Sequence, residues 1–435
     1  MMRLIVAFVL TLAATVGHAE VAIQEITTPG GIDLWLVEEQ TIPFVALEIS
    51  IKGGASLDAP GKRGAINLMT ATIEEGSGEM DARAFQTAVA ELAASFKFDV
   101  YDDSFSVSAK FLSENRDEAV ALLRQALLEP RFDQDAIDRV RGQILSIIAS
   151  NAKDPNEIAS ATLNALAFGD HPYGSSLDGT IDSVTALTRD DILAANRAVL
   201  DKSRAFVSVV GDITPADAAA MVDSLLGDLP SDGPALPGDV PFGLTGGTTV
   251  VPFDTPQSVA LFAQRGIKRD DPDFFAAYVL NTIIGGRGPE SRLMSEVREK
   301  RGLTYGVGTY LVPKDHTEYL AGSVASANDK MAEAIAVIRA QWADLAANGV
   351  TQAELDAAKT YITGEYPLRF DGNGEIADIM VGMQMIGLTP AYVVDRNTFI
   401  EAVTLEDVNR VAKELLDPAG LHFVVVGQPV GVESN

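Results

Sequence analysis

The chain has 435 residues, of which 47 % are hydrophobic, and it contains no cysteine. This length and composition support more than one hydrophobic core and exclude a disordered or fibrous protein. Asp and Glu number 61 against 33 Lys and Arg, and this acidic excess argues against binding to nucleic acid or to an anionic membrane surface. The absence of cysteine excludes disulfides, cysteine nucleophiles and thiolate metal sites.

The first nineteen residues have the pattern of a secretory signal peptide. Arg3 precedes an apolar block over residues 4–16, and small residues follow up to a cleavage site after Ala19. The apolar block is shorter than the roughly 20 residues that span a bilayer, which disfavours an uncleaved membrane anchor. No later segment looks transmembrane. We therefore expect a secreted mature chain without membrane insertion, periplasmic if the source is a Gram-negative bacterium.

Strand patterns come first in the mature chain, at residues 34–37 and 44–51, and long helical patterns follow before a final strand. Strands and helices that cluster in this way, instead of alternating one for one, predict an α+β fold with helices packed on a mostly antiparallel sheet. A parallel Rossmann-type sheet is the less favoured alternative.

An internal repeat divides the chain into two homologous halves. Residues 188–211 and 404–427 each begin with a Thr that can cap a helix and end with a β-branched strand closed by Gly. A second pair of similar helical patterns lies at residues 117–128 and 330–345, each followed by a turn and another long helical pattern.

Residues 230–241 are rich in Pro and Gly and read as a linker between the halves. The predicted division is a signal peptide over 1–19, a first domain over 20–229, a linker over 230–247 and a second domain over 248–435.

Residues 64–77 resemble the segment that carries the H-x-x-E-H zinc motif of the pitrilysin/insulinase family of inverted-zincin peptidases. In that motif two His bind zinc and the Glu activates a water molecule. The resemblance places the two His positions at Asn67 and Ala71 and the Glu position at Thr70. These side chains can neither bind zinc nor activate water, because Asn is a poor zinc ligand, Ala has no donor atom and Thr is no general base near neutrality.

Other features also predict a chain without metal. The family's third ligand, a Glu, should fall in residues 141–148, and this window has no carboxylate. The histidines beyond the signal peptide are His171, His316 and His422, and no two are within a helical turn of each other. A zinc site built from all three is the less favoured alternative, because such sites usually draw at least two ligands from one element. Residues 169–174 resemble a family loop that also carries His-Pro, which implies that His171 is a structural loop residue. We instead expect the 64–77 segment to be an ordinary packed helix, with Leu68, Met69 and Ile73 buried.

The second half carries the other motif of the same family. Residues 284–305 resemble its C-terminal signature, a Gly-rich turn, a helix ending in Arg-Glu-Lys-Arg-Gly-Leu and a strand opening with Tyr. The resemblance implies that Arg298 and Tyr305 reach a zinc site, hold substrate and stabilise an oxyanion. The alternative is that Arg298 pairs with Glu296 or Glu299 and that Tyr305 is a half-buried strand residue.

The resemblance covers nearly all of the mature chain and implies one half of a metallopeptidase clamshell. It favours the non-catalytic subunit of a heterodimeric zinc metallopeptidase, whose partner is a homologous zinc-binding subunit and whose substrates are peptides. No cofactor is expected in this chain; zinc is expected in the partner. The alternative is an inert assembly or peptide-binding scaffold of the same fold. Peptidase activity of this chain alone is disfavoured, because no Ser or Thr nucleophile evidently pairs with a His.

Overall fold

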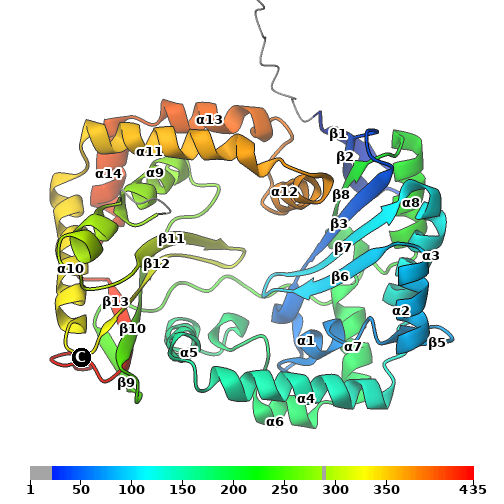
Figure 1. Cartoon of the computed structure of the whole chain (residues 1–435), viewed down its shortest axis with the longest axis horizontal. Coiled ribbons are helices and arrows are strands. Elements are labelled where there is room, and N and C mark those ends of the chain that lie inside the picture. Colours follow the sequence, from blue (N-terminus) through cyan, green and yellow to red (C-terminus); the bar gives the residue numbers. More distant parts are fainter. Residues whose placement is uncertain (1–21, 287–290) are drawn as a thin grey trace, which may run out of the picture.

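The computed structural model describes residues 22–286 and 291–435, so the predicted signal peptide lies outside the described residues. The chain forms two lobes, each a β-sheet with helices on it (Figure 1). No helix within these described ranges is long and apolar enough to cross a membrane.

The first sheet lies in the N-terminal half and has the strand order β1-β2-β8-β3-β7-β6. Neighbouring strands are antiparallel except for β2 and β8. Its strands are β1 (Gln24–Thr27), β2 (Asp33–Glu38), β3 (Phe44–Lys52), β6 (Ser95–Val100), β7 (Ser104–Leu112) and β8 (Ala205–Gly211). A separate short pair consists of β4 (Gly76–Ser77) and β5 (Met80–Asp81).

Helices of the first half pack against one face of this sheet, where alternate apolar strand residues meet apolar helix stripes in one core. The helices are α1 (Ala65–Thr70), α2 (Ala82–Glu91), α3 (Arg116–Leu128), α4 (Gln134–Asn151), α6 (Ile181–Ala186), α7 (Arg189–Val199) and α8 (Pro215–Leu226). Short 3₁₀ turns are η1 (Gly54–Leu57), η2 (Ser113–Asn115), η3 (Pro172–Gly174) and η4 (Lys202–Arg204).

The second sheet has the order β11-β12-β10-β13-β9, with only β13 and β9 parallel. Its strands are β9 (Thr248–Pro252), β10 (Gln257–Arg265), β11 (Val307–Lys314), β12 (Thr317–Ala327) and β13 (His422–Gly427). Its own core is built with α9 (Phe274–Ile284), the π-helical segment η5 (Met294–Glu299), α10 (Met331–Asn348), α11 (Gln352–Glu365), α13 (Tyr392–Ala402) and α14 (Leu405–Leu415), and η6 (Tyr366–Arg369) follows α11.

The predicted α+β fold and the repeat are confirmed, and the Rossmann-type alternative is wrong. β8 lies between β3 and β2, and β13 takes the same place between β10 and β9. The helices that precede them, α7 and α14, both start with a capping box, Thr188 with Asp191 and Thr404 with Asp407.

The two halves exchange one helix each. Helix α5 (Pro155–Phe168) comes from the first half but packs on β10 and β13 of the second sheet. Helix α12 (Asn373–Met385) comes from the second half and packs on β3 and β8 of the first. Figure 1 shows α5 beside the second lobe and α12 beside the first. The second face of each sheet is therefore covered by the other half of the chain.

The chain between α8 and β9, residues 227–247, forms no helix or strand, as the Pro- and Gly-rich composition predicts. It is attached along its length, because the Val240 amide donates to the His316 carbonyl at 2.9 Å and the Gly243 amide to the Ala167 carbonyl at 3.0 Å. The division into domains at 230–247 stays a prediction.

Candidate functional site

The helix predicted over residues 64–77 is wrong in length, because α1 ends at Thr70. Two threonine hydroxyls near its end donate back into the helix, from Thr70 to the Ile66 carbonyl at 2.8 Å and from Thr72 to the Leu68 carbonyl. Such bonds compete with the helical ladder and favour an early end. The predicted burial of three residues is confirmed: Leu68, Met69 and Ile73 are all fully buried.

The three positions that correspond to the zinc motif do not form a metal site. Asn67 donates its amide to the Asp178 carboxylate at 3.0 Å, and the hydroxyl of buried Thr70 is used by the Ile66 carbonyl. Ala71 is the exposed residue that follows the helix. Zinc needs several His, thiolate or carboxylate donors pointing to one point, and these residues do not fit it.

The window for the third ligand lies in α4, where Arg141 donates to Asp138 and to the Leu187 carbonyl. Across residues 22–286 and 291–435, no three His, Cys, Asp or Glu side chains gather closely enough to hold a metal ion.

The histidines have structural partners. His171 caps the start of η3, where its Nδ1 accepts from the Tyr173 amide, and its ring centre is 6.2 Å from that of His316. His422 lies in β13, with its Nε2 at 3.0 Å from the Thr249 hydroxyl.

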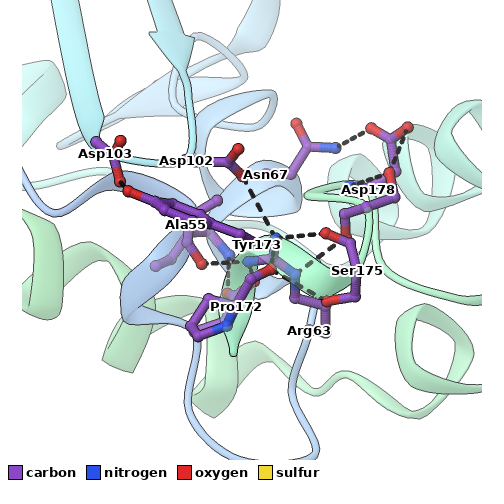
Figure 2. Close-up of polar contacts among 12 residues, drawn as sticks. Ala55, Arg63, Asn67, Asp102, Asp103, Pro172, Tyr173, Ser175 and Asp178 are labelled. Atoms are coloured by element: carbon purple, nitrogen blue, oxygen red, sulfur yellow. Dashed lines mark hydrogen bonds and ion pairs between the residues drawn. The ribbon is translucent and has the colours of Figure 1, made fainter. Parts of the chain in front are cut away.

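An arginine that the sequence did not single out holds this region together (Figure 2). Arg63, just before α1, donates through Nη1 to the Ala55 carbonyl at 2.5 Å and through Nη2 to the Pro172 and Ser175 carbonyls at 3.1 and 3.0 Å. Its Nε donates to the Ser176 carbonyl at 3.0 Å. One guanidinium thus ties the start of α1 to the loop that follows α5.

Two aspartates balance the charge of Arg63. Asp102 lies 3.6 Å from Nη2, and Asp58 lies 3.4 Å from Nη1. Asp58 also accepts from the amides of Gly64 and Ile66 at 2.8 and 2.9 Å, so it caps the start of α1. Burial raises the pKa of Asp58, although these bonds and the arginine favour its charged form. The start of the helix that carries the degenerate zinc positions is therefore held by structural bonds.

The Arg298 segment of the second half is built differently. Arg298 is exposed at the end of η5. The pairing predicted as an alternative is not seen among the described residues, because Glu296 pairs with Lys300 and Arg301 instead. No ion pair of Arg298 with Glu299 is found within the described ranges. Among the described residues, the helix and not a carboxylate therefore positions the guanidinium at the surface.

Tyr305 stands out from the surface with 88 % of its area exposed. It precedes β11, which begins at Val307, so the prediction of a half-buried strand residue is wrong. The residues before it are fixed to β12: the Thr304 hydroxyl bonds to the Ala325 carbonyl at 2.7 Å, and the Ser326 hydroxyl to the Leu303 carbonyl at 2.5 Å. A fixed backbone thus presents an unpacked phenol.

Comparisons with known proteins agree with this picture. Residues 34–181 match the family described as Insulinase (Peptidase family M16), and residues 186–362 match the Peptidase M16 inactive domain. A crystal structure of a peptidase M16 inactive domain from Pseudomonas fluorescens is 28 % identical and superposes with a TM-score of 0.88, covering 95 % of this chain and 99 % of that one.

Relatives differ in what their names claim. The non-peptidase homolog YmxG of Helicobacter pylori is 25 % identical over 89 % of this chain and 90 % of its own length. An uncharacterized zinc protease of Streptomyces coelicolor is 24 % identical over 92 % of this chain and 88 % of its own. The fold, the repeat and these matches together show that the chain belongs to the insulinase family, peptidase family M16, as a homologue whose zinc motif is lost.

Proposed function

We propose that this chain is the non-catalytic subunit of a two-chain zinc metallopeptidase of the exported compartment, the periplasm if the source is Gram-negative. It contributes Arg298 and Tyr305 to the active site of a homologous, zinc-binding partner. It also encloses half of a chamber that admits peptides. Zinc belongs to the partner, and this chain carries no cofactor.

The observation that supports the proposal best is the exposure of Tyr305. An isolated tyrosine with 88 % of its surface in water gains nothing from packing, yet its backbone is fixed by Thr304 and Ser326. A phenol held in this way is suited to donate one hydrogen bond to a developing oxyanion on another molecule. Arg298 offers forked donors to a peptide carbonyl.

The test uses a complex reconstituted from this chain and a homologue with an intact H-x-x-E-H motif. Tyr305→Phe should lower kcat about 100-fold with little change in KM, because the lost bond forms only in the transition state. Arg298→Ala should lower kcat/KM. Tyr361→Phe and Arg197→Ala, which change an exposed tyrosine and an exposed arginine elsewhere, are the controls. Full activity of both site variants would overturn the proposal.

The second candidate is an inert assembly or peptide-binding scaffold. The name of the Helicobacter relative, a non-peptidase homolog, favours it. In that case the complex with a zinc-binding homologue would form, but its rate of cleavage would not depend on Arg298 or Tyr305.

A further inference from the structure

The face of each sheet that carries the exchanged helix differs between the halves. Counting back three residues from the Gly that ends each strand, Ser208 of β8 corresponds to Val424 of β13. Ser208 pairs with Glu48 of β3, and Val424 pairs with Leu261 of β10. A buried carboxyl therefore stands where the second sheet has a leucine.

The same contrast continues across the neighbouring strands. On β7, Ser108 lies opposite Glu48 and opposite Lys97 of edge strand β6. Two residues along β7, Lys110 lies opposite Ala46, and it takes the place that Ala325 holds on β12 opposite Val259. Next to the apolar contacts of α12, this face of the first sheet is a row of charged and hydroxyl side chains.

A pocket of about 480 Å³ lies over this row, between the sheet and the start of α12. It reaches the sheet edge, because β6 is the last strand. Six charged side chains line it: Glu48 of β3, Lys97 and Asp99 of β6, Lys110 of β7, and Glu375 and Asp378 of α12. Four carboxylates against two ammonium groups leave it negative when all are ionised.

Glu48 is the buried carboxyl group of this pocket. Only 6 % of the residue is exposed, so its carboxyl is cut off from most of the water that would stabilise a charge. One oxygen accepts a hydrogen bond from the Ser108 hydroxyl at 2.6 Å. The other has no hydrogen-bond partner within residues 22–286 and 291–435. A donor that enters the pocket would supply it.

The charged neighbours do not neutralise Glu48. Lys97 forms its ion pair with Asp99 at 2.7 Å. Desolvation is the main cause that raises the pKa of Glu48 to about 7, and Asp378 adds to it, while the Ser108 bond and the more distant charges of Lys110 and Lys97 act in the opposite direction. A buried acid near its point of titration accepts a positive charge readily.

We propose that this pocket is a binding site for the cationic side chain, above all an arginine, of a peptide held in the chamber. A guanidinium presents forked donors that can satisfy the free oxygen of Glu48 and reach Asp378 or Glu375 at the mouth. The site rests on the proposed function only in that the ligand is a peptide. It assigns a preference for basic peptides to the first half of this chain.

The test measures binding by the purified full chain without any partner subunit, so its result is independent of catalysis. The probes are two fluorescent peptides of Ala and Ser, acetylated and amidated, that differ only by arginine or uncharged citrulline at the central position. We expect the arginine peptide to bind about tenfold more tightly, in the range of one charge-assisted hydrogen bond. The blocked ends ensure that only the side chain carries charge.

Glu48→Gln should bring the preference for arginine close to unity and leave the affinity for the citrulline peptide unchanged. Glu118→Gln removes the same charge from an exposed position on α3 and should keep the preference. If Glu48→Gln fails to fold, Asp378→Asn, on the exposed side of the pocket, should reduce the preference severalfold.

A pH series separates Glu48 from the other acids. The preference should fall as the pH drops below about 7 in the unaltered chain, because protonated Glu48 must lose its proton to pair with arginine. It should stay flat in Glu48→Gln. Equal affinity for the two peptides, no binding of either, or a preference that survives Glu48→Gln would each overturn this site, while the experiments on Arg298 and Tyr305 would stand unaffected.

Discussion

The two halves share a fold and have diverged in opposite ways at corresponding places. In the first half, the bonds of Arg63 tie the start of α1 to the loop after α5, whereas the second half leaves Arg298 and Tyr305 exposed at the surface. On the faces that receive the exchanged helices, the second sheet is apolar and the first carries Glu48 and a charged pocket. The two halves thus differ in how their polar side chains are used. Those around Arg63 hold the fold together, while those at Tyr305 and in the Glu48 pocket remain accessible to a ligand.

The largest expected effect comes from removing the bonds of Arg63. Arg63→Ala should lower the free energy of unfolding by about 4 kcal/mol, because buried Asp58 loses its counter-charge and several carbonyls lose their donor. Urea denaturation measures this. Arg83→Ala, at an exposed position on α2, should change it by less than about 0.5 kcal/mol. A loss below about 1 kcal/mol for Arg63→Ala would show that the network is not structural.

The helix exchange predicts that the halves unfold together. Leu163→Ala on α5 and Met380→Ala on α12 each empty a buried position against the other half's sheet and should each cost about 3 kcal/mol. Both should shift one common unfolding transition, followed by circular dichroism and by tryptophan fluorescence. Val394→Ala, at an exposed position, is the control. Two separate transitions, each moved by only one variant, would contradict the exchange as the basis of cooperativity.

Replacing Glu48 in the charged pocket should stabilise the fold, whereas the variants above destabilise it. The pKa of Glu48 is raised in the folded chain to about 7 from an ordinary value of 4.5, so the folded state binds the proton more tightly than the unfolded state. Ionisation therefore destabilises the fold progressively between these two values and fully above about 7. Glu48→Gln should raise the free energy of unfolding by about 2 kcal/mol at about pH 8 and by almost nothing at about pH 4. Destabilisation by Glu48→Gln at both pH values would contradict this.

The smallest expected effect comes from replacing exposed Tyr305. Tyr305→Ala should change the free energy of unfolding by less than about 0.5 kcal/mol, because an 88 % exposed side chain contributes little packing. Thermal and urea denaturation of the purified chain check this. A loss above about 2 kcal/mol would mean that Tyr305 is a packing residue, and the contrast with Arg63 would disappear.

Much of the fold could be predicted because its signals are local. The Thr-capped helices and the β-branched strands ended by Gly211 and Gly427 mark the same place in both sheets. The helix exchange could not be predicted, since periodicity shows that α5 and α12 are partly apolar but not which sheet covers them.

The site could be predicted only in part, because some of its contacts join residues that are far apart in the sequence. The lost motif is visible at Asn67, Thr70 and Ala71, but the role of Arg63 depends on carbonyls more than a hundred residues away. Glu48 did leave a signal, as the single charge inside the apolar strand over residues 44–51. Its importance depends on what covers that face of the sheet, which is fixed only by the tertiary structure.

The most direct measurement is the zinc content of the purified chain, by elemental analysis, alone and after mixing with a homologue that has an intact H-x-x-E-H motif, together with peptide cleavage. We predict that the chain alone binds no stoichiometric zinc and cleaves nothing, and that the mixture cleaves faster than the homologue alone. Stoichiometric zinc with cleavage by the chain alone would contradict the central claim, that this is the non-catalytic half of the enzyme.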